Sequence, residues 1–345
     1  MGTIDLAGTA RSTAGQVADQ GVGAVVAVLA DGRSEIHGAG RTGADQGPPD
    51  SRTVFEIGSV TKVFTALVLA RAVGDGQVAL DEPLADLLPP GTRVPSRDGE
   101  QITLQHLATH TSGLPRLPRG MRIPALLRPG KPDPYAHCTP AVLLRGLATT
   151  RLGATPGTRF RYSNLGAGLL GLALARRAGT GYADLVADRL TRPLGLDDTA
   201  VGLVRPGRMA QGHTPRLRPT VPWDLAGLAG AGGLRSTAAD LTAFLRAHLD
   251  PPAGWAAAAV RLARAVEHPQ NPFARAHLGW FSHRLHAGQG GHLQVWHNGG
   301  TGGFASFAGF DPEKRVGAVV LGNTRRSVDR EGFGLLRTLQ DAYTA

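Results

Sequence analysis

The feature that most constrains the fold is the separation of strand-like and helix-like segments along the chain. Short apolar runs typical of strands form one group near each end, at residues 22–30, 34–40, 293–297, 304–310 and 316–321. Between the two groups, apolar residues recur at helical spacing, as in 165–173 and 241–248. The Asp31-Gly32 pair predicts a hairpin turn between the first two strands.

Such short turns connect antiparallel neighbours. We therefore predict an α+β fold in which both ends of the chain contribute to one antiparallel sheet flanked by helices. Residues 1–90 and 272–345 would form this α/β domain, and residues 91–271 would form an inserted, mainly helical domain. Two stretches rich in Pro, Gly and Arg, 115–134 and 204–222, are predicted to be long surface loops.

Composition excludes several classes of protein. Of the 345 residues, 42% are hydrophobic, which suffices for a buried core, but no apolar run is long enough to span a membrane. The formal net charge is +10. Only Lys62, Lys131 and Lys314 are lysines, and the arginines are scattered over the chain without a dense basic block. We therefore expect no nucleic-acid partner and no membrane span.

The sequence also argues against disulfides, metals and a leader. Cys138 is the only cysteine, so no intrachain disulfide or cysteine-based zinc site is expected. His106 and His110 lack the glutamate of a metalloprotease helix, and we predict no metal and no cofactor. The first twenty residues carry Asp5 and Asp19 and lack a basic segment followed by an apolar one. We expect no signal peptide and a cytoplasmic protein, or a secreted one if the N-terminus was processed.

The strongest signal for chemistry is the segment 57–62 (IGSVTK), which is followed by an apolar stripe at helical spacing. Ser59 and Lys62 are three residues apart at the start of this predicted helix, so the amine can reach the hydroxyl. A neutral amine accepts the hydroxyl proton if desolvation or a neighbouring positive charge lowers its pKa. The alternative is an ordinary N-cap serine beside a surface lysine.

A second signal is the Tyr162-Ser163-Asn164 corner, which precedes the helical pattern at 165–173. The Tyr162 phenol is a candidate base or proton relay once nearby Lys62 depresses its pKa. The Asn164 amide can both donate to and accept from a substrate amide. The alternative is Asn164 as a helix N-cap and Tyr162 as a packed aromatic residue.

Residues 296–304 (WHNGGTGGF) form the third signal, at the end of a predicted strand. Glycines this dense weaken a strand, and they are expected where the backbone closely approaches a ligand. An exposed strand end also offers an amide N–H to a developing oxyanion. His297, Gly299 and Gly300 are therefore candidate substrate-binding residues, with a merely flexible loop as the alternative.

In this order, Ser-x-x-Lys, Tyr-x-Asn and His-x-Gly resemble the motifs of the serine beta-lactamase and penicillin-binding protein superfamily. Tyr-x-Asn is similar to the motif of its class C beta-lactamase branch, which also holds D,D-peptidases, amidases, esterases and acyltransferases. Residues 107–115 (LATHTSGLP) and the glycine-rich segment 230–240 resemble further signatures of this branch. The similarity extends from Thr53 to Asn323.

The resemblance implies a beta-lactamase/transpeptidase-like fold with the active site in the cleft between the two domains. It implies that Ser59 is the acylated nucleophile, that Lys62 and Tyr162 transfer protons and that Asn164 positions the substrate. The N–H groups of Ser59 and Gly300 would form the oxyanion hole. The implied function is a serine hydrolase that cleaves a small ester, an amide or a short peptide through an acyl-enzyme.

The chain departs from many beta-lactamases at His297, where they carry a lysine. A histidine with a pKa near 6.5 is mostly neutral at pH 7, so small esters or amides are expected to be better substrates than penicillins. Loop arginines, Arg116, Arg205 and Arg208 among them, would restore a positive charge if they border the cleft. Two other functions stay open: acyl transfer to an alcohol or amine, and a catalytically inactive binding module.

Overall fold

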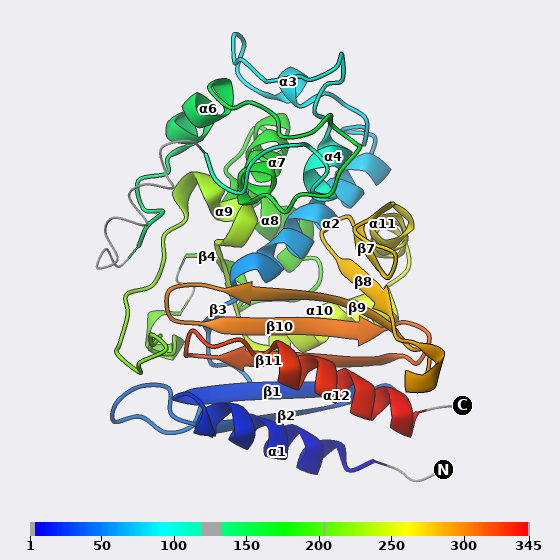
Figure 1. Cartoon of the computed structure of the whole chain (residues 1–345). Coiled ribbons are helices and arrows are strands. Elements are labelled where there is room, and N and C mark those ends of the chain that lie inside the picture. The colour runs from blue at the N-terminus through cyan, green and yellow to red at the C-terminus, as the bar shows by residue number, and fades with distance from the viewer. Residues whose placement is uncertain (1–3, 119–132, 203–204, 344–345) are drawn as a thin grey trace.

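The computed structural model describes residues 4–118, 133–202 and 205–343, and its centre is an eight-stranded antiparallel sheet (Figure 1). The strand order is β2-β1-β11-β10-β9-β8-β7-β6, so strands from both ends of the chain pair with each other. The strands are β1 (Gly23–Ala30), β2 (Arg33–Gly40), β6 (Glu267–Pro269), β7 (Ala274–His277), β8 (Phe281–Arg284), β9 (Leu293–Gly300), β10 (Ala305–Asp311) and β11 (Val316–Gly322).

The five strands predicted from the sequence are present, and β9 runs further than expected, to Gly300. Its glycines hold strand geometry because β10 pairs with them, Ser306 opposite Gly299 and Ala305 opposite Gly300. The sequence analysis missed β6, β7 and β8. These strands are three or four residues long and mix Arg and His with apolar residues, so they show no measurable period.

Helices cover both faces of the sheet. α1 (Leu6–Asp19) and α12 (Asp329–Ala342) pack on the face that is in front in Figure 1, and α10 (Ala238–Leu249) packs on the other face. Because both faces are covered, all eight residues of β1 are buried. The sheet is therefore a well-packed frame for the residues that its strand ends carry.

The mainly helical part lies above the sheet in Figure 1, and α2 (Thr61–Gly74) runs through it. α2 packs against α7, α9 and α11, and the turn η1 (Gly58–Val60) at its start contacts β9. The other α-helices of the described residues are α3 (Leu84–Leu87), α4 (Leu104–Ala108), α6 (Pro140–Ala148), α7 (Asn164–Arg177), α8 (Tyr182–Val186), α9 (Ala229–Gly232) and α11 (Trp255–Ala265). The start of α2 thus lies where the helical part meets the sheet.

A small sheet lies beside this junction, in the strand order β3-β5-β4. It consists of β3 (Phe55–Glu56), β5 (Leu234–Ser236) and β4 (Ala200–Val201). β3 leads directly into η1, so its pairing with β5 fixes the backbone that enters the turn.

The domain boundaries at residues 90/91 and 271/272 stay a prediction. Two elements within 91–271 belong to the sheet part, because α10 packs on β1, β10 and β11 and β6 is the edge strand of the large sheet. An amphipathic pattern shows that a helix has a buried face but not which core it joins.

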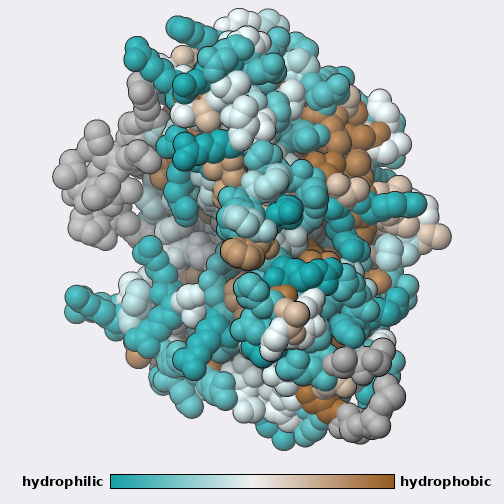
Figure 2. Space-filling view, turned by 45° about the vertical axis from the view of Figure 1, so that its right-hand side comes forward, coloured by the Kyte–Doolittle hydropathy of each residue, from teal (hydrophilic) through white to brown (hydrophobic). Residues whose placement is uncertain are grey.

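No helix in the described part of the chain combines the length and the apolar character needed to cross a bilayer. Figure 2 shows a face that is mostly hydrophilic, with hydrophobic residues gathered in its upper right part.

Candidate active site

Ser59 lies in the turn η1, immediately before α2, and Lys62 lies in the first turn of that helix. Lys62 Nζ is 3.0 Å from Ser59 Oγ and donates a hydrogen bond of 2.7 Å to the carbonyl oxygen of Ala231. Ser59 lines a cavity of about 750 Å³, whereas Lys62 is only 3% exposed. The contact expected across one helical turn is therefore present.

The surroundings of Lys62 favour its neutral form. Burial, followed by the positive charge of Arg116, lowers the pKa of the Lys62 amine well below its ordinary value. Among the described residues, Arg116 is the one charged group that shifts this pKa. A neutral amine within hydrogen-bond distance of a serine hydroxyl can accept its proton, which is the role of a general base.

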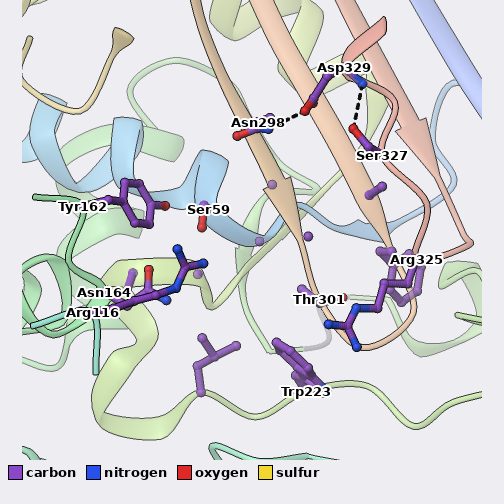
Figure 3. Close-up of a pocket in the computed structure, with 18 of the residues that line it drawn as sticks. Ser59, Arg116, Tyr162, Asn164, Trp223, Asn298, Thr301, Arg325, Ser327 and Asp329 are labelled. Carbon is purple, nitrogen blue, oxygen red and sulfur yellow. Dashed lines mark hydrogen bonds between the residues drawn. The ribbon is translucent and has the colours of Figure 1, made fainter. Parts of the chain in front are cut away.

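Tyr162 lies against the same pair. Its phenol points toward Ser59 (Figure 3), and Lys62 Nζ is 4.9 Å from the centroid of its ring. Burial raises the pKa of the phenol to about 12, outweighing the lowering by Ser59 and Arg116. The expectation that Lys62 depresses this pKa is wrong, because desolvation dominates at both residues. Tyr162 is therefore a protonated phenol that can relay a proton, and Lys62 is the better base.

Asn164 is the first residue of α7 and not its N-cap. Ser163 caps the helix, since its hydroxyl accepts a hydrogen bond of 2.9 Å from the Gly166 N–H. Asn164 lines the cavity on the same side of Ser59 as Tyr162 (Figure 3). Its buried Oδ1 has no hydrogen-bond partner among the described residues, so this acceptor is available to a substrate N–H.

The end of β9 approaches the Ser59 turn closely. Gly58 has a φ of +48°, and a Cβ there would lie 2.7 Å from the Gly300 nitrogen. A Cβ at Gly299 would lie 2.1 Å from the carbonyl oxygen of Ile57. Glycine is needed at Gly58 and Gly299 because backbone packs against backbone, which brings Ser59 and Gly300 together at the cavity wall.

His297 is not among the residues that line the cavity. Its ring is fully buried, stacks on Phe281 with 5.0 Å between centroids, and lies 6.4 Å from the Tyr162 ring. Burial, with a smaller contribution from Lys62, lowers the pKa of His297 to about 3. The expectation that His297 becomes charged below pH 6.5 is therefore wrong. Its neighbours Trp296 and Asn298 line the cavity.

His110 supports Tyr162 from the segment 107–115. Its buried ring lies 4.5 Å from the Tyr162 ring, and its Nδ1 accepts the Ser163 N–H at 3.3 Å. The sequence analysis rejected His110 as a metal ligand but did not assign it this supporting role, although the LATHTSGLP signature contains it. The described residues include no group of three or more His, Cys, Asp or Glu side chains that could hold a metal ion.

The two predicted loops contribute unequally to the cavity. Arg116 lines it, as does Trp223, which follows the second loop. Arg205 and Arg208 instead form ion pairs with carboxylates elsewhere. Residues 119–132, with most of the first loop, lie outside the described part.

The segment between β11 and α12 also reaches the cavity, a contribution that the sequence analysis missed. Arg325, Ser327 and Asp329 line it, and Asn298 Nδ2 donates a hydrogen bond of 2.8 Å to Asp329 Oδ2 (Figure 3). No local pattern marks these positions, because they reach the cavity only through the packing of the strands beside them.

Comparison with known proteins identifies the family. The profile described as Beta-lactamase matches residues 10–340. The chain belongs to the beta-lactamase family. This family member is 30% identical over 287 residues to the D-alanyl-D-alanine-carboxypeptidase/endopeptidase AmpH of Escherichia coli, covering 79% of this chain and 71% of that protein. It is 28% identical to Penicillin-binding protein 4 of Amycolatopsis lactamdurans, over 87% of this chain and 80% of the relative.

Solved structures of the family share the fold. A beta-lactamase/D-alanine carboxypeptidase from Yersinia pestis, complexed with citrate, matches with a TM-score of 0.78 at 27% identity, over 95% of this chain and 98% of that one. Its counterpart from Pseudomonas syringae gives 0.82 at 24% identity, over 98% and 99%. The predicted α+β fold and superfamily are confirmed, and this family member is a serine hydrolase.

Proposed function

We propose that this beta-lactamase family member hydrolyses an ester or amide bond through a covalent acyl-enzyme on Ser59. The observation that carries the proposal is the 3.0 Å contact between Ser59 Oγ and the buried amine of Lys62, whose pKa burial lowers well below its ordinary value. A serine hydroxyl is a weak nucleophile until an adjacent base takes its proton. The phenol of Tyr162, which points toward Ser59, supports the same assignment.

In the acylation step, Ser59 Oγ attacks the substrate carbonyl carbon while its proton passes to Lys62 Nζ. The carbonyl oxygen becomes an oxyanion that the N–H groups of Ser59 and Gly300 stabilise. As the tetrahedral intermediate collapses, the bond to the leaving alcohol or amine breaks. Tyr162 donates its phenol proton to the leaving atom and regains a proton from Lys62. Water then attacks the acyl-enzyme with the same groups in reverse order, and the acid is released.

The preferred substrate in this proposal carries a carboxylate near the scissile bond. The Arg325 side chain lies at the cavity beside Thr301 and Trp223 (Figure 3). Its guanidinium offers a permanent positive charge, which the buried His297 does not. Many beta-lactamases carry a lysine at the position of His297. Because Arg325 can take over its charge, the absence of that lysine does not argue against substrates with a carboxylate, beta-lactams included. A short peptide would also fit the name of the AmpH relative, a D-alanyl-D-alanine-carboxypeptidase/endopeptidase.

The test compares four substrates: a neutral short-chain aryl ester, the same ester with a carboxylate, an acylated D-Ala-D-Ala peptide and a chromogenic cephalosporin. We expect turnover of both esters and an acyl adduct on Ser59 by intact mass. A charged hydrogen bond predicts that the carboxylate ester has a kcat/KM roughly tenfold to a hundredfold higher. Arg325→Met should remove that difference, whereas the distant, exposed Arg11→Met should leave it.

The outcomes separate the parts of the proposal. If no substrate is turned over and Ser59 carries no adduct, the catalytic function is wrong and an inactive binding module is favoured. Equal rates for the two esters would overturn the carboxylate preference alone. A competing alcohol or amine that captures most of the acyl group would identify an acyltransferase instead.

A further inference from the structure

Two basic side chains, those of Lys62 and Arg116, lie near the Tyr162 ring. Lys62 Nζ is 4.9 Å from the ring centroid, and the guanidinium carbon of Arg116 is 5.2 Å from it. Figure 3 shows Arg116 extending toward Tyr162 and Ser59 from the same side of the cavity as Asn164. Both distances are within the range in which a cation interacts with an aromatic ring.

The backbone of Arg116 is hydrogen-bonded to the start of α7, the helix that begins two residues after Tyr162. Its carbonyl oxygen accepts hydrogen bonds from the N–H groups of Asn164 at 3.0 Å and Leu165 at 3.1 Å. These contacts hold the residue after the LATHTSGLP segment against the start of α7 whatever its side chain is. A substitution of the side chain therefore tests the guanidinium itself.

The third motif, residues 296–304, supplies no positive charge near Lys62 and Tyr162. His297 is buried next to Tyr162 and Phe281 and is neutral at pH 5 and above, since burial lowers its pKa to about 3. Lys62 must itself be neutral to act as a base. Arg116 is then the permanent cation among the described groups beside the proton-transfer pair.

We propose that Arg116 is a positioning residue whose guanidinium keeps Lys62 unprotonated and stabilises negative charge on the Tyr162 oxygen while a proton passes between them. This role rests on the acyl-enzyme function proposed above. Arg116 acts through Lys62 and Tyr162 and needs no contact with the reacting atoms. Its side chain is exposed to the cavity, so its effect strengthens when a substrate displaces the water there.

The other titratable groups around Lys62 do not oppose this effect. Besides Tyr162 and Arg116, they are His110 from the LATHTSGLP segment and His297 from β9, and α9 contributes only the carbonyl of Ala231. Burial lowers the pKa of both imidazoles, so both stay neutral at catalytic pH. No carboxylate of the described residues contributes to the Lys62 pKa.

The experiment measures the rate constant for labelling of Ser59 by an uncharged aryl phosphonate as a function of pH. Labelling joins Ser59 Oγ to phosphorus, expels the aryl oxide and transfers the hydroxyl proton to Lys62, so the acidic limb reports the base of the free enzyme. In Arg116→Met the midpoint of this limb should move upward by roughly half a pH unit to one unit, because a repelling charge is lost. Arg116→Lys should keep the midpoint of the parent.

Arg11→Met, which removes an exposed charge on α1, is the matched control and should not move the limb. If Arg116→Met melts at a lower temperature than the parent, Arg116→Gln is used in its place. An unchanged midpoint in Arg116→Met or Arg116→Gln would overturn the inference. If the midpoint is unchanged and only the KM for the carboxylate ester rises in the variant, Arg116 is a substrate contact and the inference is also overturned. If the parent itself is not labelled on Ser59, the proposed function fails first.

Discussion

The two walls of the cavity contribute in different ways. The helical wall, defined here as Ser59, Lys62, Tyr162 and Asn164, supplies side chains that contact one another or face the cavity. The strand wall, residues 296–300 of β9, supplies its backbone where glycines approach the turn η1. The motif histidine on that wall is buried and neutral.

The difference between the two walls shows which properties of a motif residue can be predicted from the sequence. Side chains three residues apart at a helix start meet for a local reason, because helical geometry alone brings them together. The orientation and charge of a strand residue depend on what packs on each face of the sheet. The contact between Ser59 and Lys62 could thus be inferred from their spacing, whereas the orientation and charge of His297 could not.

The largest expected effect tests the nucleophile on the helical wall against a serine at the opposite side of the cavity. Ser59→Ala should lower kcat/KM by at least about 10⁴-fold and abolish phosphonate labelling. Ser327→Ala should change kcat/KM by less than about tenfold, since the Ser327 hydroxyl serves mainly to accept the Asp329 N–H just before α12. Mass spectrometry of the labelled peptides checks both, and an adduct on Ser112, Ser163 or Ser327 would contradict the assignment.

The next effect concerns the proton-transfer pair. Lys62→Ala and Tyr162→Phe should each lower kcat/KM by about 10²- to 10⁴-fold, because each residue handles the same proton. The double variant should be little worse than the poorer single variant. A double-mutant cycle measures this coupling. Two losses that simply add on a logarithmic scale would show that the residues act independently.

Adjacent glycines test whether the strand wall works through its backbone. Gly299→Ala should lower kcat/KM by about a hundredfold or more, because its Cβ would lie 2.1 Å from the Ile57 oxygen and displace β9 from Ser59. Gly300→Ala keeps the N–H and meets nothing nearer than the Phe304 oxygen at 3.8 Å, so its loss should stay below about tenfold. Equal losses in the two variants would refute this view of the wall.

The smallest expected effect concerns the buried imidazole of His297 and is a change in stability with pH. The pKa of His297 in the folded protein is lowered to about 3. The contribution of the neutral imidazole to the free energy of unfolding is therefore complete above the ordinary pKa of about 6.5, and it is lost as the pH falls toward 3. At pH 5 the loss is about 2 kcal/mol. Denaturant titrations at pH 5 and 8 should show a weaker pH dependence in His297→Asn than in the parent. The exposed His286→Asn is the control, and an unchanged dependence in His297→Asn would contradict the burial argument.

Much of the architecture followed from local patterns. Short apolar runs located β1, β2, β9, β10 and β11, because a strand covered on both faces is apolar along its length, and helical periods located α7 and α10. Strands β6, β7 and β8 were missed because they are too short to show one. The alternative that Asn164 is the N-cap of α7 is wrong. Ser163, one residue earlier, also has a side chain that can cap a helix, and it occupies the N-cap position.

The pairing of Ser59 and Lys62 could be predicted from their positions in the sequence, because the geometry of a helix start sets their separation. The charges of the site residues depend instead on the tertiary structure. Burial by segments distant in sequence lowers the pKa values of Lys62 and His297 and raises that of Tyr162. Arg325 reaches the cavity because strands from opposite ends of the chain pair. Desolvation and proximity are properties of the packed molecule, and no spacing along the chain encodes them.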